Sequence, residues 1–163
     1  MCTQWRDPVL PELAVCDLLT RRYTLLPRIP DCLLASTLVQ ILDEHIECFD
    51  AFFVPSGDYN DAQFRVIGWT HCEAMTTVFV YSSVSSCWSV GTSTSWDALG
   101  LNVRPEGIPP PSWRPSYACG CFYWKVTLSN KLLKLDINRM EFSVVCLPPG
   151  HENWDTVVVE AGE

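Results

Sequence analysis

The chain has 163 residues, of which 48% are hydrophobic and 18% are charged, and its formal net charge is −8. Such a length is typical of one domain, and the apolar content excludes a disordered chain and is enough for a core. Eleven Lys and Arg against nineteen Asp and Glu argue against nucleic acid, whose phosphates attract basic side chains, and against an anionic membrane surface. We therefore expect neither nucleic acid nor a membrane as a partner.

The cysteines and the ends of the chain give an expectation for the compartment. The chain carries nine cysteines, an odd number with no CxxC pair, which is typical of reduced thiols rather than of a disulfide framework. No run approaches the roughly 20 apolar residues of a membrane-spanning helix. The first residues show no apolar core of a secretory signal. We expect a cytoplasmic or nuclear protein.

Three segments of the chain share one layout. In each, a short apolar strand ends on a polar turn former, five loop residues follow, and an aromatic residue six positions after the turn former opens a second strand. The segments are Leu13–Asp17 with Tyr23–Leu26, Val78–Ser82 with Trp88–Val90, and Leu132–Asp136 with Phe142–Val145. This pattern predicts three β-hairpins, in which Trp88 and Phe142 belong to the core.

Further strands are expected around these hairpins. They are Cys48–Val54, Phe64–Trp69, Tyr117–Trp124 and Asp155–Glu160. A unit of about 50 residues with several strands and a recurrent aromatic is typical of a kelch-type β-propeller blade. A closed ring of 4–8 such blades needs about 200–400 residues. We therefore expect an all-β fold, a partial β-propeller of about two to three antiparallel blades with open edges.

The predicted organisation is a single partial propeller domain over 1–163. Its parts are a half blade (1–30), a connector (31–47), a blade (48–92), a Pro-rich loop (93–116), a blade (117–150) and the start of a next blade (151–163). In the connector, apolar residues recur at helical spacing after Pro30 and Asp31, which predicts one short helix near 33–47. The alternative is a loop between blades that enters the strand Cys48–Val54.

Several motifs together suggest a family. Val15-Cys-Asp-Leu-Leu-Thr-Arg-Arg-Tyr-Thr-Leu-Leu-Pro27, Phe64-Arg-Val-Ile67, Val78–Ser83 with Trp88, Gly120-Cys-Phe-Tyr-Trp124, and Leu133–Asp136 followed by Glu141-Phe-Ser143 and Leu147–Gly150 resemble, in order, the elements of plant F-box-associated, kelch-like propellers. The resemblance covers nearly the whole chain. It implies the substrate receptor of an SCF-type ubiquitin ligase, in which an F-box binds a Skp-type adaptor and the propeller recruits the target.

The chain departs from this family at two points. The Pro that follows Val-Cys-Asp in the family is Leu18 here. The string Leu10-Pro-Glu-Leu13 is similar to the opening of an F-box, but the helical continuation is missing because Ala14–Asp17 leads directly into the propeller element. We therefore expect a truncated member without an F-box, and a Skp-type adaptor as partner only if an F-box is present after all.

Catalytic and metal-binding motifs are weak. The pairs His45 with Cys48, His71 with Cys72, and Cys119 with Cys121 lack a second pair at zinc-site spacing, although the last two would share one face of a strand. Buried cysteines acting as small apolar side chains are commoner. The chain also lacks a nucleophile elbow, a P-loop and a dinucleotide fingerprint. We expect no enzyme, no cofactor and no metal.

The candidate partner-binding residues lie in the Pro-rich loop. They are Trp96, Arg104, Trp113 and Arg114, since Trp and Arg are enriched at interface hot spots and loops carry binding residues. The alternative for both tryptophans is that they pack the loop onto the domain. Acidic runs over 43–61 and 141–163, neither with a Lys or Arg, either steer a basic partner or are solvated faces.

The function predicted from the sequence is a non-catalytic protein-recognition module that resembles the substrate-receptor part of an F-box protein, with the target unidentified. The alternative is a truncated structural or interaction protein that self-associates through its open strand edges.

Overall fold

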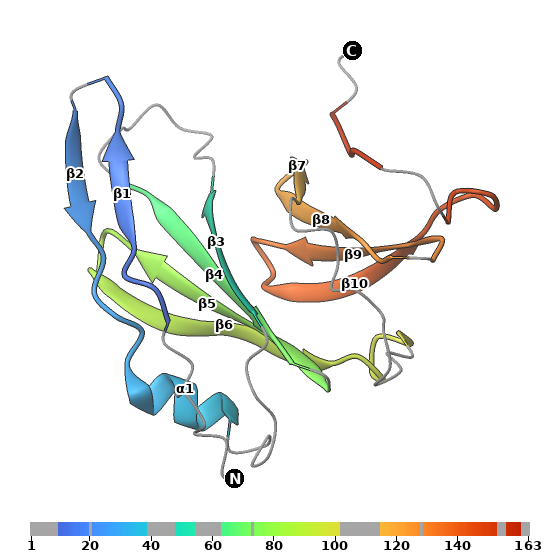
Figure 1. Ribbon diagram of the computed structural model, residues 1–163, viewed down its shortest axis with the longest axis horizontal. Helices are drawn as coiled ribbons and strands as arrows, with labels where there is room; N and C mark the ends of the chain where they lie inside the picture. Colours follow the sequence, from blue (N-terminus) through green and yellow to red (C-terminus); the bar gives the residue numbers. More distant parts are fainter. Residues whose placement is uncertain are drawn as a thin grey trace, which may run out of the picture. The chain divides into compact units, whose positions relative to one another are not determined.

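The fold is known from a computed structural model. It describes residues 10–19, 21–38, 48–54, 63–72, 74–101, 115–127, 129–152 and 156–160. The chain forms two compact units, Met1–Ser93 and Thr94–Glu163, whose elements are drawn in Figure 1. Within the described residues, one helix accompanies three open antiparallel sheets. The prediction of an all-β fold built from open, blade-like sheets is confirmed.

The first unit combines a hairpin, a short helix and a four-stranded sheet. Strands β1 (Ala14–Asp17) and β2 (Arg22–Leu25) form the hairpin, and α1 (Asp31–Leu38) follows. The sheet has the order β3-β4-β5-β6, with its strands in chain order. Their bounds are Cys48–Val54 for β3, Arg65–His71 for β4, Met75–Ser82 for β5 and Cys87–Ser95 for β6. Such a meander is the topology of one propeller blade.

The second unit contains a sheet of the same kind. Its order is β10-β9-β8-β7, again consecutive in the chain and antiparallel throughout. The bounds are Ser116–Ala118 for β7, Cys121–Lys125 for β8, Lys131–Asp136 for β9 and Glu141–Cys146 for β10. Its buried face carries Trp124, Leu133 and Leu135, each at 0% exposed. The described strands of this unit thus form a second blade-like sheet with a core of its own.

The three predicted hairpins are the β1–β2, β5–β6 and β9–β10 pairs, and they share one turn geometry. The last loop residue before the second strand has a positive φ in each: 56° at Arg21, 52° at Ser86 and 52° at Met140. The turn formers Asp17 and Asp136 accept backbone N–H groups of their own loops, at 2.9 Å each. The internal repeat seen in the sequence is therefore also a repeat of backbone conformation.

These N–H groups also affect the charge of the third turn. The N–H groups of Arg139 and Asn138 point at the carboxylate of Asp136 and hold its pKa below the ordinary value. A carboxylate that accepts such bonds is stabilised in its charged form. The turn former therefore acts as an anionic acceptor over the ordinary pH range.

Two expected strands differ in the structure. The segment Tyr117–Trp124 is a hairpin rather than one strand, because Cys119 (φ 49°) and Gly120 (φ 72°) form a two-residue turn between β7 and β8. Positive φ at both central residues is the type I′ pattern that joins tight hairpins. Of the expected strand Asp155–Glu160, the described residues 156–160 are not in a strand.

The predicted helix is present and begins earlier than expected. It is described over Asp31–Leu38, whereas the prediction placed it near 33–47, and residues 39–47 lie outside the described part of the chain. The N–H groups of Leu33 and Leu34 donate to the carbonyl of Pro30, which fixes the first turn. Phe49, which continues the apolar helical spacing, lies in β3, the expected strand over Cys48–Val54. Within the described residues, no helix has the length and apolar character needed to cross a lipid bilayer.

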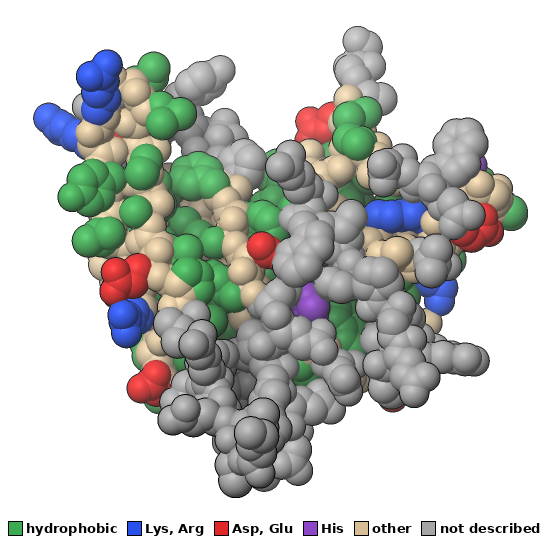
Figure 2. All heavy atoms as spheres, viewed as in Figure 1, with side chains coloured by type: hydrophobic (Ala, Val, Ile, Leu, Met, Phe, Trp, Pro, Cys, Tyr) green, Lys and Arg blue, Asp and Glu red, His purple; other side chains and the backbone are tan. Residues whose placement is uncertain are grey.

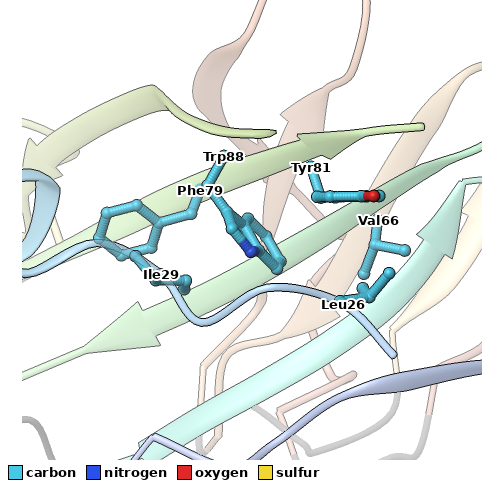
Figure 3. Packing of buried hydrophobic residues seen from close by; sticks show 6 residues of the cluster. All are labelled: Leu26, Ile29, Val66, Phe79, Tyr81 and Trp88. Carbon is cyan, nitrogen blue, oxygen red and sulfur yellow. The ribbon is translucent and has the colours of Figure 1, made fainter. Parts of the chain in front are cut away.

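The core of the first unit lies between the sheet and the segment that follows the hairpin. Val66 of β4, Phe79 and Tyr81 of β5, and Trp88 of β6 share one face of the sheet and pack against Leu26 and Ile29 (Figure 3). All six side chains are at most 7% exposed. This face of the sheet also carries the candidate site.

Candidate functional site

A row of four aromatic rings crosses the sheet of the first unit. Phe53 of β3 stacks on Phe64 at 5.8 Å between ring centroids. Phe64 lies 6.0 Å from Tyr81, and Tyr81 lies 5.5 Å from Trp88. Phe64 precedes β4 and is held by Ser83, whose hydroxyl accepts the N–H of Phe64 and whose N–H donates to the carbonyl of Phe64. The row thus runs from the β3 edge of the sheet to the β6 edge.

The Trp88 end of this row is closed. The indole N–H of Trp88 donates to the carbonyl of Pro27 at 2.7 Å, and Leu26 and Ile29 cover the ring. The N–H of Leu26 in turn donates to the carbonyl of Leu13. The segment after the hairpin is therefore fixed over the closed end by both backbone and side-chain bonds.

The Phe53 end of the row is open. Phe53 is 51% exposed, although it lies on the same face as the buried Val66 and directly opposite it in the β3–β4 register. Phe53 thus adds exposed aromatic surface to the open end of the row, where a ligand can cover it.

A cleft lies over this open end, between the β1–β2 hairpin and the sheet. We call it the hairpin cleft. Its volume is about 790 Å³, which is within the range of sites that hold peptides or small molecules. Phe53, Phe64 and Val66 line it from the sheet, and Leu13, Val15 and Leu26 line it from the hairpin. Asp17 and Arg22, exposed and next to the hairpin turn, add one charge of each sign.

The edge of β1 borders the hairpin cleft. Residues from both faces of β1 line the cleft, including Ala14 and Cys16 as well as Leu13 and Val15. The N–H of Leu26 donates to the carbonyl of Leu13, so these two residues form a hydrogen-bonded pair across the hairpin. In an antiparallel ladder, hydrogen-bonded and non-hydrogen-bonded pairs alternate. The N–H and C=O groups of the next residue, Ala14, and of Cys16 therefore point away from β2. Within the described residues, β1 pairs only with β2. The cleft therefore combines apolar walls with backbone groups of β1 that no other described strand pairs with.

The surface around the hairpin is apolar with a basic tip. Figure 2 shows hydrophobic side chains over β1 and β2, and basic side chains at the end of the hairpin. Leu18 and Leu19 of the turn are 87% and 96% exposed, and Arg21 and Arg22 are also exposed. This arrangement provides apolar contact area around the hairpin cleft.

Two titratable groups lie on the opposite face of the same sheet. Burial raises the pKa of Asp50 and lowers the pKa of His71, because it disfavours the charged form of each. Asp50 lies opposite Trp69 in the register, and the Trp69 and His71 rings are 5.0 Å apart. The indole N–H of Trp69 donates to the hydroxyl of Thr76 at 2.6 Å, and that hydroxyl donates to the carbonyl of Thr70. These bonds satisfy polar groups inside the sheet.

Of the predicted partner-binding residues, the structure describes Trp96 alone. Trp96 is 5% exposed, and its carbonyl accepts the N–H groups of Leu99 and Leu101 in the turn after β6. A side chain this deeply buried offers little surface to a partner. Its burial agrees with the alternative that Trp96 packs the loop onto the domain. Arg104, Trp113 and Arg114 lie outside the described residues.

The cysteine and histidine pairs are not arranged as ligand sets where they are described. Cys119 lies in the β7–β8 turn and is exposed, whereas Cys121 is buried in β8, so the two do not share a strand face as expected. Cys72 is buried and directs its thiol to the carbonyl of Met75. Across the described ranges, no three His, Cys, Asp or Glu side chains are grouped so that they could hold a metal ion.

Comparisons of the chain with models of protein families, with curated proteins and with solved structures find no match. The family that the sequence motifs suggest therefore stays a prediction.

The hairpin cleft was not expected from the sequence. Its walls come from positions about 40 residues apart, Leu13 and Val15 on one side and Phe53 and Phe64 on the other. A partial signal was present, because the apolar run over Ala51–Val54 is continuous instead of alternating. Such a run predicts a strand with apolar side chains on both faces.

Proposed function

We propose that the chain is a non-catalytic protein-recognition module that holds an extended apolar segment of a partner protein in the hairpin cleft. The observation that carries the proposal is the cleft itself, where the half-exposed Phe53 and the unpaired edge of β1 lie together. An extended segment can add to a strand edge by main-chain hydrogen bonds while its alternate side chains enter an apolar pocket. The chemistry of the cleft matches both requirements.

Its apolar and charged groups define the preferred ligand. Phe53, Phe64 and Leu13 favour aliphatic or aromatic side chains at every second position of the bound segment, since side chains of a strand alternate between its faces. Asp17 and Arg22 at the turn favour a polar residue beyond the apolar stretch. No chemical step is required of any residue in this role.

The resemblance to F-box-associated propellers extends the proposal to a biological role. In that role the bound segment belongs to a protein that a ubiquitin ligase marks, and the chain is the recognition part of such a ligase without its F-box. Leu10 and Leu13 of the F-box-like string pack against the core of the first unit. That packing supports a structural role for Leu10 and Leu13, since side chains packed against the core are not available to bind an adaptor.

A peptide selection tests the cleft. A phage-displayed random peptide library is selected on the full chain, and the recovered peptides are measured against the chain, a Phe53→Asp variant and a Val84→Asp control by fluorescence anisotropy. Val84 is 69% exposed and lies in the β5–β6 turn, outside the cleft. We expect peptides with alternating apolar residues whose affinity falls tenfold or more with Phe53→Asp and stays unchanged with Val84→Asp. Equal binding to all three proteins would contradict the proposal.

A direct binding measurement tests the ligase role. The full chain is titrated with a purified plant Skp-type adaptor, with an intact F-box protein as the positive control. The proposal expects no complex with the adaptor. A complex that is lost on Leu10→Asp would mean that an F-box is present and that the chain is a complete receptor.

A second candidate function is self-association through open strand edges. The exposed apolar surface of the β1–β2 hairpin favours it, since Tyr23 and Leu25 are 69% and 65% exposed. Contiguous exposed apolar side chains on an edge hairpin are a common origin of pairing between chains.

A further inference from the structure

The β1–β2 hairpin has an outer face that points away from the hairpin cleft side chains. It consists of Ala14 and Cys16 of β1 and of Tyr23 and Leu25 of β2, which the register places together. All four side chains are exposed. The other face of the hairpin packs on the core through Leu13 and Val15, whereas this face leaves Tyr23 and Leu25 in water, which is unfavourable by the hydrophobic effect. The outer face is therefore a candidate for contact with another surface.

The internal repeat identifies what kind of face it is. In each hairpin, the residues one and three positions before the turn former and six positions after it share one face. In the second hairpin these are Tyr81, Phe79 and Trp88, at 4%, 1% and 6% exposed. In the third they are Leu135, Leu133 and Phe142, at 0%, 0% and 8% exposed. Two copies of the face are thus buried, and the first copy (Cys16, Ala14 and Tyr23) is exposed.

The second hairpin shows how such a face is covered. Leu26 and Ile29, from the stretch that follows the first hairpin, pack on Phe79, Tyr81 and Trp88. The carbonyl of Pro27 accepts the indole N–H of Trp88. Here the stretch that leaves the first hairpin covers the face of the second hairpin.

The stretch that follows the third hairpin carries matching apolar side chains. Residues 156–160, here called the C-terminal segment, have Val157 and Val159 each at 74% exposed. The residue between them, Val158, is half-buried and donates its N–H to the hydroxyl of Ser116 at the start of β7. The N–H of Cys119 donates to the carboxylate of Glu160 at 2.5 Å. The segment is therefore held along β7 with two valines directed outward.

The charges of the two surfaces are opposite. The exposed Arg21 and Arg22 lie beside the outer face. The C-terminal segment carries the exposed Glu160 and no Lys or Arg. Opposite charges around an apolar contact favour the correct orientation and discourage pairing of like surfaces.

We propose that the C-terminal segment of a second copy of this chain covers the outer face of the β1–β2 hairpin, so that copies assemble head to tail. Val157 and Val159 of one copy lie on Tyr23 and Leu25 of the next, and Arg21 and Arg22 face Glu160. The contact is heterologous, so each copy donates one surface and accepts on the other. The inference rests on the second candidate function, and its failure leaves the peptide-binding proposal intact, because Tyr23 and Leu25 of the outer face do not line the hairpin cleft.

Two double variants test the assembly. Tyr23→Glu with Leu25→Glu alters the accepting face, and Val157→Glu with Val159→Glu alters the donated segment. Each of these side chains is at least 65% exposed, so folding is expected to persist. The control is Val84→Glu, which places the same charge on an exposed valine of another turn. Sedimentation velocity of the full chain over a concentration series, with a reductant to keep the exposed cysteines reduced, gives the oligomeric state.

The expected results are specific to head-to-tail contact. Wild type and Val84→Glu associate with rising concentration, and each double variant alone associates at least tenfold more weakly. A mixture of the two double variants forms a one-to-one dimer, because each still carries one intact surface. The proposal is overturned by a wild type that is monomeric throughout, or by undiminished association of the Val157→Glu, Val159→Glu variant, which would mean that outer faces pair with each other.

A milder pair of variants keeps the test decisive if the glutamates unfold the chain. Leu25→Ser and Val157→Ser remove apolar surface without adding charge, and circular dichroism confirms the fold of each. Weaker association of both, with recovery in their mixture, supports the proposal. Association equal to wild type for either one contradicts it.

Discussion

Single residues in left-handed conformation define the hairpin turns. Arg21, Ser86 and Met140 occupy the same loop position in three hairpins, each with φ between 52° and 56°. A side chain in this region costs roughly 1–2 kcal/mol relative to the right-handed conformation, whereas glycine adopts it readily. The turns are therefore fixed by the flanking strands and by side-chain acceptors such as Asp17 and Asp136, not by the residue at the strained position.

The positive φ of Ser86 in the β5–β6 turn predicts how a glycine at this position changes the stability of the fold. Ser86→Gly is expected to stabilise the chain by about 0.5–1 kcal/mol, because it relieves the positive φ at an exposed position. The matched control is Ser85→Gly, the same change one residue earlier, where φ is not positive. That variant is expected to lose about 0.5–1 kcal/mol through added chain entropy. Urea denaturation measures both, and equal effects of the two changes would contradict this account of the turn.

Asp50 predicts a pH dependence. Burial raises the pKa of the Asp50 carboxyl group above its ordinary value of 3.8. Just above that pH, the folded chain therefore keeps the proton on this carboxyl group, whereas the unfolded chain has released it. Stability therefore falls as the pH rises through the folded-state pKa. Asp50→Asn is expected to be more stable than wild type at neutral pH, with a difference that disappears on acidification below the ordinary value. Denaturation at several pH values measures it, with the exposed Asp97→Asn as the control, and a difference independent of pH would contradict the assignment.

At the scale of elements, local sequence signals identified most strands. The turn formers Asp17, Ser82 and Asp136 and the aromatics six residues later located all three hairpins, because turn chemistry and period-two patterns are local. The β7–β8 hairpin was missed because the apolar run Tyr117–Trp124 continues through its turn. The helix was expected near 33–47 and is described from Asp31 to Leu38, so its start lies earlier than the apolar spacing indicated.

The candidate site was far less predictable than the strands. The hairpin cleft depends on how the β1–β2 hairpin lies over the sheet, which brings Leu13 to Phe53 across about 40 residues. The local sequence patterns around Leu13 and around Phe53 give no information on how close these two residues lie in the fold. Trp96 was chosen as a binding residue because tryptophan is enriched at protein interfaces, yet its side chain is buried. The enrichment of a residue type at interfaces does not tell whether one particular ring is exposed or packed.

The attachment of the hairpin to the sheet depends on Trp88. Trp88→Phe removes the N–H that bonds to Pro27 and leaves part of the space beside Leu26 and Ile29 unfilled. We expect a loss of at least about 1 kcal/mol in stability and faster hydrogen exchange at Leu26, whose N–H bonds to Leu13. Tyr23→Phe, a comparable loss of one polar group on an exposed ring, is the control and should change neither. Unchanged exchange at Leu26 in Trp88→Phe would mean that the hairpin is held by other contacts.

At the scale of the whole molecule, both proposed interactions arise from the first hairpin. Each of the other two hairpins is part of a four-stranded sheet, and β1–β2 forms a two-stranded sheet within the described residues. One side of this hairpin borders the cleft with Phe53, and the other carries Tyr23 and Leu25 in water. The units contain blade-like sheets with buried aromatic cores, so recognition is left to the strands and side chains that these sheets leave uncovered.

The central claim is that the hairpin cleft receives an extended segment along β1. Hydrogen exchange of the full chain, alone and with a peptide selected on it, measures this most directly. We expect that the amides of Ala14 and Cys16, which point away from β2, become protected by the peptide, and that Phe53→Asp abolishes the protection. Protection elsewhere in the chain with unchanged exchange at Ala14 and Cys16 would contradict it.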